Sequence, residues 1–155
     1  MLKLRGVAAH CDIPCKIYDP AVAQVSALSV VRLMDIIAEV GTPKTPDESA
    51  KLARVVMEKE QQAGIVKTEV TIIWGDFFKA PQVEANPGVH DLVHRIMRAG
   101  SACKQGIDRA DGENLVTLVN EFAQMFWQSK GLETQTVLAP YPPELPICQP
   151  VLERA

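Results

Sequence analysis

Apolar residues recur at helical spacing through most of residues 21–130, and this periodicity restricts the fold more than any other feature of the chain. The first stretch, residues 21–40, carries one apolar stripe made of Val30, Leu33, Met34, Ile37 and Val40. Gly41 and Pro43 follow this stripe and are typical of a helix end. The sequence therefore predicts a first helix over residues 21–40.

The second stretch begins near Pro46 and Asp47, and its broad apolar face comprises Leu52, Val55, Val56, Ala63, Val66, Val70 and Ile73. Residues 66–73 are rich in β-branched side chains, alternate as a strand does, and follow Gly64. Periodicity alone therefore leaves helix and strand both open for residues 66–73.

Two further helices complete the pattern. Asn86 is a suitable N-cap and Pro87 suits a first helical position. The apolar face that follows is Val89, Leu92, Val93, Ile96 and Met97. The fourth helix is expected to begin near Asp111 and to end before Gly131, with a stripe made of Leu115, Leu118, Val119, Phe122 and Phe126. Four helices with short connections predict an all-α fold, an antiparallel four-helix bundle.

The end of the chain has a different composition. Five prolines fall in the last 25 residues, at positions 140, 142, 143, 146 and 150. A short, aperiodic, proline-rich segment of this kind is expected to be extended and to pack on a neighbour.

Composition restricts the class of protein. With 155 residues, 47% of them hydrophobic, the chain is long enough for one domain with a buried core. A formal net charge of −3 and the absence of a basic patch argue against nucleic acid as a partner. No apolar run approaches the roughly 20 residues that cross a bilayer, so no membrane partner is expected. The first nine residues lack a secretory apolar stretch, which predicts a cytoplasmic protein.

The segment from His10 to Pro20 carries the chemistry. His10, Cys11 and Cys15 place two thiols and an imidazole within six residues. Pro14 favours a turn that brings Cys15 back toward Cys11, and Asp12 suits an Asx-type bond within that turn. Thiolate and nitrogen donors suit zinc, copper or nickel, and the spacing does not choose among them. Spacing alone leaves a metal site and a pair of incidental thiols both open.

This segment resembles the nickel-binding hook of nickel superoxide dismutases, which reads His-Cys-x-x-Pro-Cys-Gly-x-Tyr. The positions that match are His10, Cys11, Pro14, Cys15 and Tyr18. Further segments are similar to that family in the same order, namely Trp74–Pro81, His90–Leu92, Ser101–Lys104 and Met125–Trp127. The resemblance therefore covers about residues 10–131.

The resemblance implies a four-helix bundle assembled as a homohexamer, and it favours helix for residues 66–73. It also implies that the chain is a precursor. Residues 1–9 would be a propeptide that a maturation protease removes, residues 10–131 the bundle with its hook, and residues 132–155 a C-terminal tail.

The resemblance also implies the reaction and its ligands. The nickel ion would bind the α-amine of His10, the backbone nitrogen of Cys11, and the sulfurs of Cys11 and Cys15. The His10 imidazole would bind in the oxidised state, and Tyr18 would screen the metal and guide small anions. The enzyme would convert superoxide to oxygen and hydrogen peroxide by cycling between Ni(II) and Ni(III). The alternative is a thiolate metal-binding helical oligomer without dismutase activity.

The chain departs from the family pattern at four positions. Lys16 replaces a glycine, which is unfavourable if that glycine has a positive φ, although its cation would attract superoxide. Phe77 stands where the family often has a second tyrosine. Ser26 and Gln62 stand where some members place the Glu and Arg that orient the hook histidine, which leaves the orientation of His10 unexplained.

The remaining metal-binding residue types are expected to be structural. Cys103 and Cys148 are predicted to be buried structural thiols, and Trp74 and Trp127 core or subunit-contact residues. His90 and His94 lie one helical turn apart, but no third ligand is evident, so they are predicted to be a surface pair.

Overall fold

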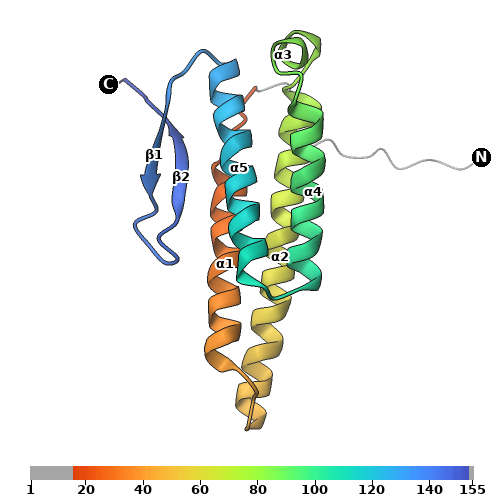
Figure 1. Cartoon of the computed structure of the whole chain (residues 1–155), viewed down its shortest axis with the longest axis vertical. Coiled ribbons are helices and arrows are strands. Elements are labelled where there is room, and N and C mark those ends of the chain that lie inside the picture. The colour runs from red at the N-terminus through yellow and green to blue at the C-terminus, as the bar shows by residue number, and fades with distance from the viewer. Residues whose placement is uncertain (1–15, 154–155) are drawn as a thin grey trace, which may run out of the picture.

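Four long helices form the body of the molecule in the computed structural model, which describes residues 16–153 (Figure 1). They are α1 (Ala21–Val40), α2 (Pro46–Asp76), α4 (Val89–Gln105) and α5 (Arg109–Ser129). A short helix, α3 (Ala80–Ala85), lies between α2 and α4, and two strands, β1 (Thr134–Leu138) and β2 (Pro146–Pro150), follow α5. The predicted four-helix bundle is confirmed.

The ends of α1 and α2 follow from local chemistry. Gly41 ends α1 with a φ of 60°, and its N–H donates to the carbonyl of Ile37. Thr45 caps α2 because its hydroxyl accepts a hydrogen bond from the N–H of Glu48 at 3.1 Å. Residues 66–73 lie within α2, so the helix interpretation is correct there. Burial of Val66, Val70 and Ile73 on one helical face outweighs their preference for strands.

The start of α4 differs from the expectation. Asn86 does not cap this helix, since it ends α3, where its N–H donates to the carbonyls of Gln82 and Val83. Its side-chain amide donates to Ser129 at 3.0 Å, which ties α3 to the end of α5. The helix α4 begins later, at Val89. Pro81 lies in the first turn of α3, where proline is well tolerated, and the sequence patterns did not predict that short helix.

The apolar stripes meet along the bundle axis. Phe122 and Phe126 of α5 are completely buried, and each contributes about 2 kcal/mol through burial of its ring. Helices α5 and α1 meet closely at Gly112, where an added Cβ would lie 2.9 Å from Val31 Cγ2 and 3.0 Å from Met34 Sδ. The absence of a side chain at this position allows α5 to approach α1.

Helix α1 differs from the expectation for membrane spans. By length and composition alone it could cross a membrane, because its mean hydropathy reaches 1.6. Half of this window is buried inside the molecule, with Val30 and Val31 fully inaccessible. A helix packed in the core of a bundle has the same composition, so core packing accounts for the hydropathy of α1.

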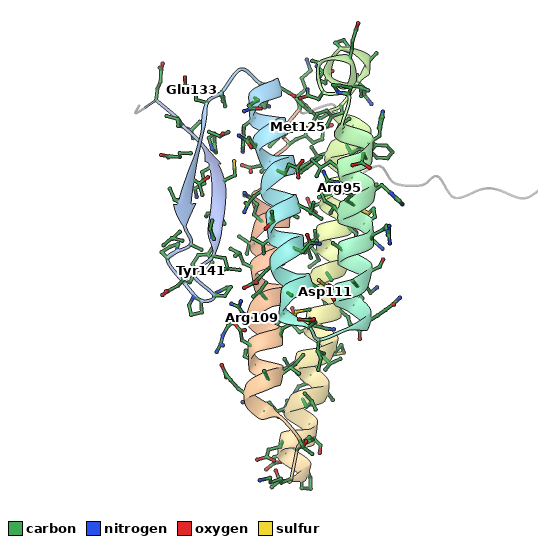
Figure 2. The ribbon with its side chains drawn as sticks, in the orientation of Figure 1. Arg95, Arg109, Asp111, Met125, Glu133 and Tyr141 are labelled. Atoms are coloured by element: carbon green, nitrogen blue, oxygen red, sulfur yellow. The ribbon has the colours of Figure 1, made fainter. Side chains whose placement is uncertain are left out.

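The C-terminal tail is not simply extended. Strands β1 and β2 form an antiparallel hairpin that lies along α5, with Tyr141 at its tip and Glu133 at its opposite end (Figures 1 and 2). Asn120 of α5 holds the hairpin: its amide donates to the Pro146 carbonyl at 2.7 Å and its oxygen accepts from the Cys148 N–H at 3.0 Å. Gln24 of α1 donates to the Cys148 carbonyl at 2.7 Å. The hairpin is held by these tertiary hydrogen bonds. Its sequence carries no long apolar pattern from which it could have been predicted.

Candidate functional site

The predicted nickel ligands precede the described part of the chain. His10, Cys11 and Cys15, together with Asp12, lie outside residues 16–153, so their arrangement stays a prediction. The chain enters the described region at Lys16, the residue that follows Cys15, and reaches α1 at Ala21. The described residues nearest in sequence to the predicted ligands are therefore those around this entry.

A cavity of about 550 Å³ lies beside the entry of the chain. Residues from the entry segment, the end of α2, the connection to α3, and the end of α5 line it, namely Lys16, Tyr18, Asp76, Phe77, Lys79, Pro81, Gln82 and Lys130. Three lysines against one aspartate give its wall a net positive charge, which favours a small anion.

Two of the three lysines are held by specific contacts. The ammonium group of Lys79 donates to the carbonyl of Gly75 at 2.8 Å. The ammonium group of Lys130 lies over two aromatic rings, 5.6 Å from the centre of Phe77 and 5.2 Å from that of Phe126. These contacts fix the two cations at the helix ends that form the wall of the cavity.

Lys16 differs from the other two lysines. Its side chain is exposed, and its φ is 59°, in the left-handed region where glycine is favoured. The expected backbone cost at this position is therefore present, because a positive φ costs a lysine roughly 1 kcal/mol. In return, the chain gains a third cation beside the cavity.

Aromatic rings pack beneath the segment by which the chain enters α1. The half-buried ring of Tyr18 lies 6.3 Å from Phe77, and Phe77 in turn lies 4.7 Å from Phe126 in the core. These contacts connect the entry segment to the bundle. Phe77 lines the cavity without a hydroxyl group, so at this position the chain offers an apolar surface.

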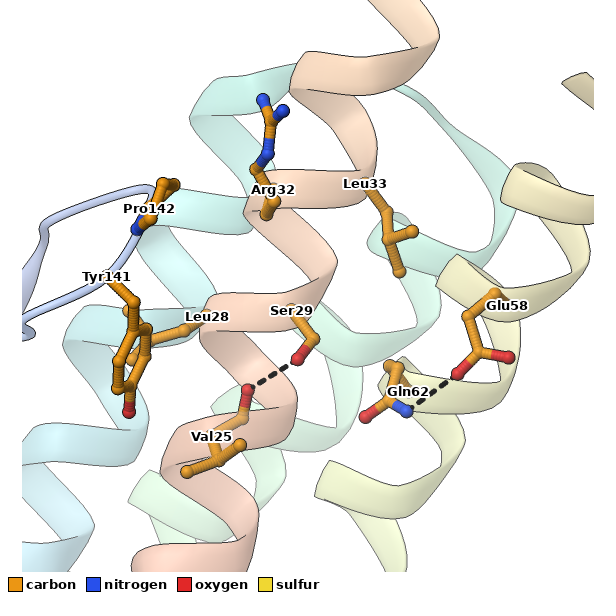
Figure 3. Close-up of a pocket in the computed structure, with 9 residues that line it drawn as sticks. All are labelled: Val25, Leu28, Ser29, Arg32, Leu33, Glu58, Gln62, Tyr141 and Pro142. Atoms are coloured by element: carbon orange, nitrogen blue, oxygen red, sulfur yellow. Dashed lines mark hydrogen bonds between the residues drawn. The ribbon is translucent and has the colours of Figure 1, made fainter. Parts of the chain in front are cut away.

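The other two departures lie elsewhere. Ser26 is buried in the bundle, with 4% of its surface exposed. Gln62 donates to Glu58 at 2.8 Å on its own helix, and both line a second pocket of about 260 Å³ between α1, α2 and the hairpin tip (Figure 3). The Gln62 amide is thus occupied by a carboxylate of α2.

The remaining candidates behave as structural residues. Cys103 and Cys148 are buried free thiols, as predicted. Burial raises the pKa of Cys103 to about 11, with the charge of Asp111 adding to the effect and Lys59 opposing it. Burial also raises the pKa of Cys148, against a hydrogen bond from Thr134. Both thiols are therefore protonated and weakly reactive at neutral pH.

The histidines of α4 form no metal cluster with other described residues. Within residues 16–153, no three His, Cys, Asp or Glu side chains are grouped as metal ligands. His90 and His94 are exposed, and Trp74 donates its indole N–H to Nδ1 of His90 at 2.9 Å. Trp127 is buried in the core, as expected, whereas Trp74 is only half-buried.

Sequence analysis missed part of the cavity wall. Asp76 and Lys79 fall within the segment Trp74–Pro81, so the match of this segment was a usable signal. Lys130 had no such signal, because only the packing of the α5 end against Phe77 brings it to the cavity.

The fold and the cavity define a small helical-bundle protein with a positively charged pocket where its N-terminal segment enters. The sequence profile of the nickel-containing superoxide dismutases matches residues 5–130. The chain belongs to this family.

Individual relatives agree with the profile. The nickel superoxide dismutase of Streptomyces seoulensis is 35% identical over 124 residues, which cover 80% of this chain and 90% of the relative. That of Streptomyces coelicolor is 36% identical over the same coverage. The native crystal structure of a nickel superoxide dismutase superposes with a TM-score of 0.70 at 35% identity, covering 78% of this chain and 99% of that one.

Proposed function

We propose that this chain is a superoxide dismutase whose nickel ion is held by His10, Cys11 and Cys15 after removal of residues 1–9. The observation that carries the proposal is the positive cavity at Lys16, next in sequence to Cys15, in a chain of the nickel superoxide dismutase family. The donor set fits the metal, because two thiolates with amine and amide nitrogens suit Ni(II). The bound nickel would supply the one-electron oxidation and reduction that dismutation requires.

The residues of the cavity would handle the substrate. Two superoxide ions and two protons yield one oxygen molecule and one hydrogen peroxide, so an anion must enter and neutral products must leave. The positive wall formed by Lys16, Lys79 and Lys130 raises the local concentration of the anion and does not retain the products. Tyr18, packed on Phe77, would limit access so that only small molecules approach the ligands.

Cleavage before His10 would control activity, because only a free α-amine can serve as the amine ligand. We expect full-length protein to bind nickel weakly and to lack dismutase activity. Protein that begins at His10 should become active with nickel. Nickel content and the dismutation rate of the two forms test whether cleavage is required. Equal rates would rule out the amine ligand.

Cysteine variants separate this function from the alternative of a thiolate metal-binding oligomer. In the processed protein, Cys11→Ser should abolish activity and nickel binding, whereas Cys103→Ser, at a buried thiol, should retain both. Nickel binding without any dismutation in the unsubstituted processed protein would favour the alternative.

Assembly and location are further parts of the proposal. We expect a homohexamer in the cytoplasm, matured by a protease. Partly exposed apolar side chains near the start of α1 support assembly, since Ile17 is 79% exposed and Val22 and Val25 are 50% exposed. Sedimentation of the 17.0 kDa chain measures the number of copies, and a monomer would contradict the assembly.

A further inference from the structure

The two edges of the C-terminal hairpin differ in how their backbone groups are hydrogen-bonded. At one end of the β1–β2 pairing, the N–H of Val151 donates to the carbonyl of Glu133. At the other end, the N–H of Ala139 donates to the carbonyl of Leu145. Because antiparallel pairs alternate, the backbone groups of odd-numbered β1 residues point toward β2, and those of even-numbered residues point outward. The hairpin therefore has one outward row on β1 and another on β2.

The outward row of β2 is fully used or blocked. Asn120 and Gln24 bind the carbonyls of Pro146 and Cys148 and the N–H of Cys148, and Pro146 and Pro150 have no N–H to offer. This edge faces α5 (Figure 1). It has no free hydrogen-bonding groups for another strand except the Pro150 carbonyl.

The outward row of β1 has no such cover. The backbone groups of Thr134, Thr136 and Leu138 point away from the bundle, and no hydrogen bond within residues 16–153 engages them. The strand contains no charged residue or proline, which are features that natural edge strands use against pairing. Among the described residues it is therefore a free edge.

Apolar exposure is concentrated at the same end of the chain. Of the nine exposed large apolar side chains in the described region, four lie in the tail: Leu138, Tyr141, Val151 and Leu152. Leu138, on the free edge itself, is 67% exposed. A partner strand would cover part of this surface.

We propose that β1 pairs antiparallel with β1 of a second copy of this chain, around a two-fold axis at Thr136. In this register Thr136 lies opposite its own copy and Thr134 opposite Leu138 of the partner. The outward N–H and carbonyl groups then meet in pairs, which completes six backbone hydrogen bonds in a four-stranded sheet.

The charges permit this register. Glu133 lies opposite the small, neutral Ala139 of the second copy, and the two Glu133 side chains are separated by about 20 Å along the strands. No like charges are opposed, and an identical strand satisfies every outward group. The strand has no charged residue that would select a different peptide, so a second copy is the fitting occupant. The pairing lies outside residues 5–130, the part shared with the family, and is independent of the nickel site.

The first test is sedimentation of the full chain with a matched pair of variants. Thr136 is exposed, so Thr136→Lys should leave the hairpin folded but oppose two cations at the two-fold axis. Thr136→Val retains β-propensity and adds no charge. We expect the assembly of Thr136→Lys protein to dissociate at a concentration at least about tenfold higher than that of wild-type and Thr136→Val proteins, because the variant loses the strand pairing. Equal dissociation concentrations for all three proteins would overturn the proposal.

Hydrogen exchange resolved to single residues provides a second test that needs no variant. The inward amides of Gln135 and Val137 should be protected at every concentration. Those of Thr136 and Leu138 should be protected in concentrated protein and exchange roughly tenfold faster after dilution into the dissociated state. Fast exchange of Thr136 and Leu138 at all concentrations, beside protected Gln135 and Val137, would show an unpaired edge and refute the pairing.

Discussion

At the scale of single residues, Lys16 combines a backbone cost with an electrostatic gain. Its φ of 59° suits glycine, yet its cation lies on the wall of the cavity. A surface charge affects the encounter with a small anion over about one Debye length, roughly 10 Å at 0.1 M salt. The position of Lys16 therefore predicts an effect on rate rather than on nickel binding.

In processed, nickel-loaded protein, Lys16→Gly should lower the second-order rate at low salt a few-fold and flatten its dependence on ionic strength. Lys16→Glu should lower the rate further. Lys51→Glu is the control, since Lys51 lies at the opposite end of α2, about 40 Å from Asp76. An unchanged rate in Lys16→Gly protein that retains its nickel would contradict electrostatic guidance.

Cys103 should respond to pH through its buried thiol. Its pKa rises from the ordinary 9.0 to about 11 on folding, so its contribution to stability is complete below pH 9 and is lost as the pH rises through about 11. The loss should be about 2 kcal/mol. The free energy of unfolding, measured from pH 8 to 11, should fall more steeply in wild-type protein than in Cys103→Ala protein. Parallel curves would show that Cys103 does not titrate differently in the folded state.

At the scale of elements, two glycines within helices have opposite surroundings. Gly112 of α5 faces Val31 and Met34 of α1 at distances that exclude a Cβ, whereas Gly64 of α2 has nothing within 4 Å of such an atom. The same substitution therefore separates helix propensity from helix contact.

Gly112→Ala should destabilise the bundle by roughly 1–3 kcal/mol, because α5 must move away from α1. Gly64→Ala should stabilise it by up to about 1 kcal/mol through helix propensity alone. Denaturant unfolding of both variants measures the difference. A stabilising Gly112→Ala would mean that the α1–α5 contact adapts without cost.

At the scale of the whole molecule, side-chain hydrogen bonds from Asn120 and Gln24 attach the tail to the bundle, beside the buried Ile147 and Cys148. Asn120 binds two backbone groups of β2 and also accepts a hydrogen bond from Gln24 at 2.9 Å. Truncation of Asn120 therefore removes two of these bonds at once, while the four helices retain their own core.

Asn120→Ala should release the hairpin and cost about 1–3 kcal/mol, because it leaves the Cys148 N–H and the Pro146 carbonyl without these partners. Limited proteolysis should then cleave the tail faster than in wild-type protein, with helix content preserved. Asn114→Ala, at an exposed position of α5, is the control and should leave cleavage unchanged. Equal cleavage of both variants would show that other contacts hold the hairpin.

Local sequence patterns determined the four long helices, the limits of α1 and many of the buried core residues, because a 3.6-residue apolar period depends only on neighbours along the chain. They left residues 66–73 open and missed α3 and the hairpin. Burial against other helices decided that residues 66–73 are helical, and hydrogen bonds from Asn120 and Gln24 hold the hairpin.

The candidate site also has one part that the sequence determined and one part that it did not. His10, Cys11 and Cys15 are close in sequence and were found as a motif, whereas the cavity wall required Lys16, Lys79 and Lys130 to meet from three separate segments. Only tertiary packing brings such residues together, since nothing in their local sequence specifies which distant helix end they will face.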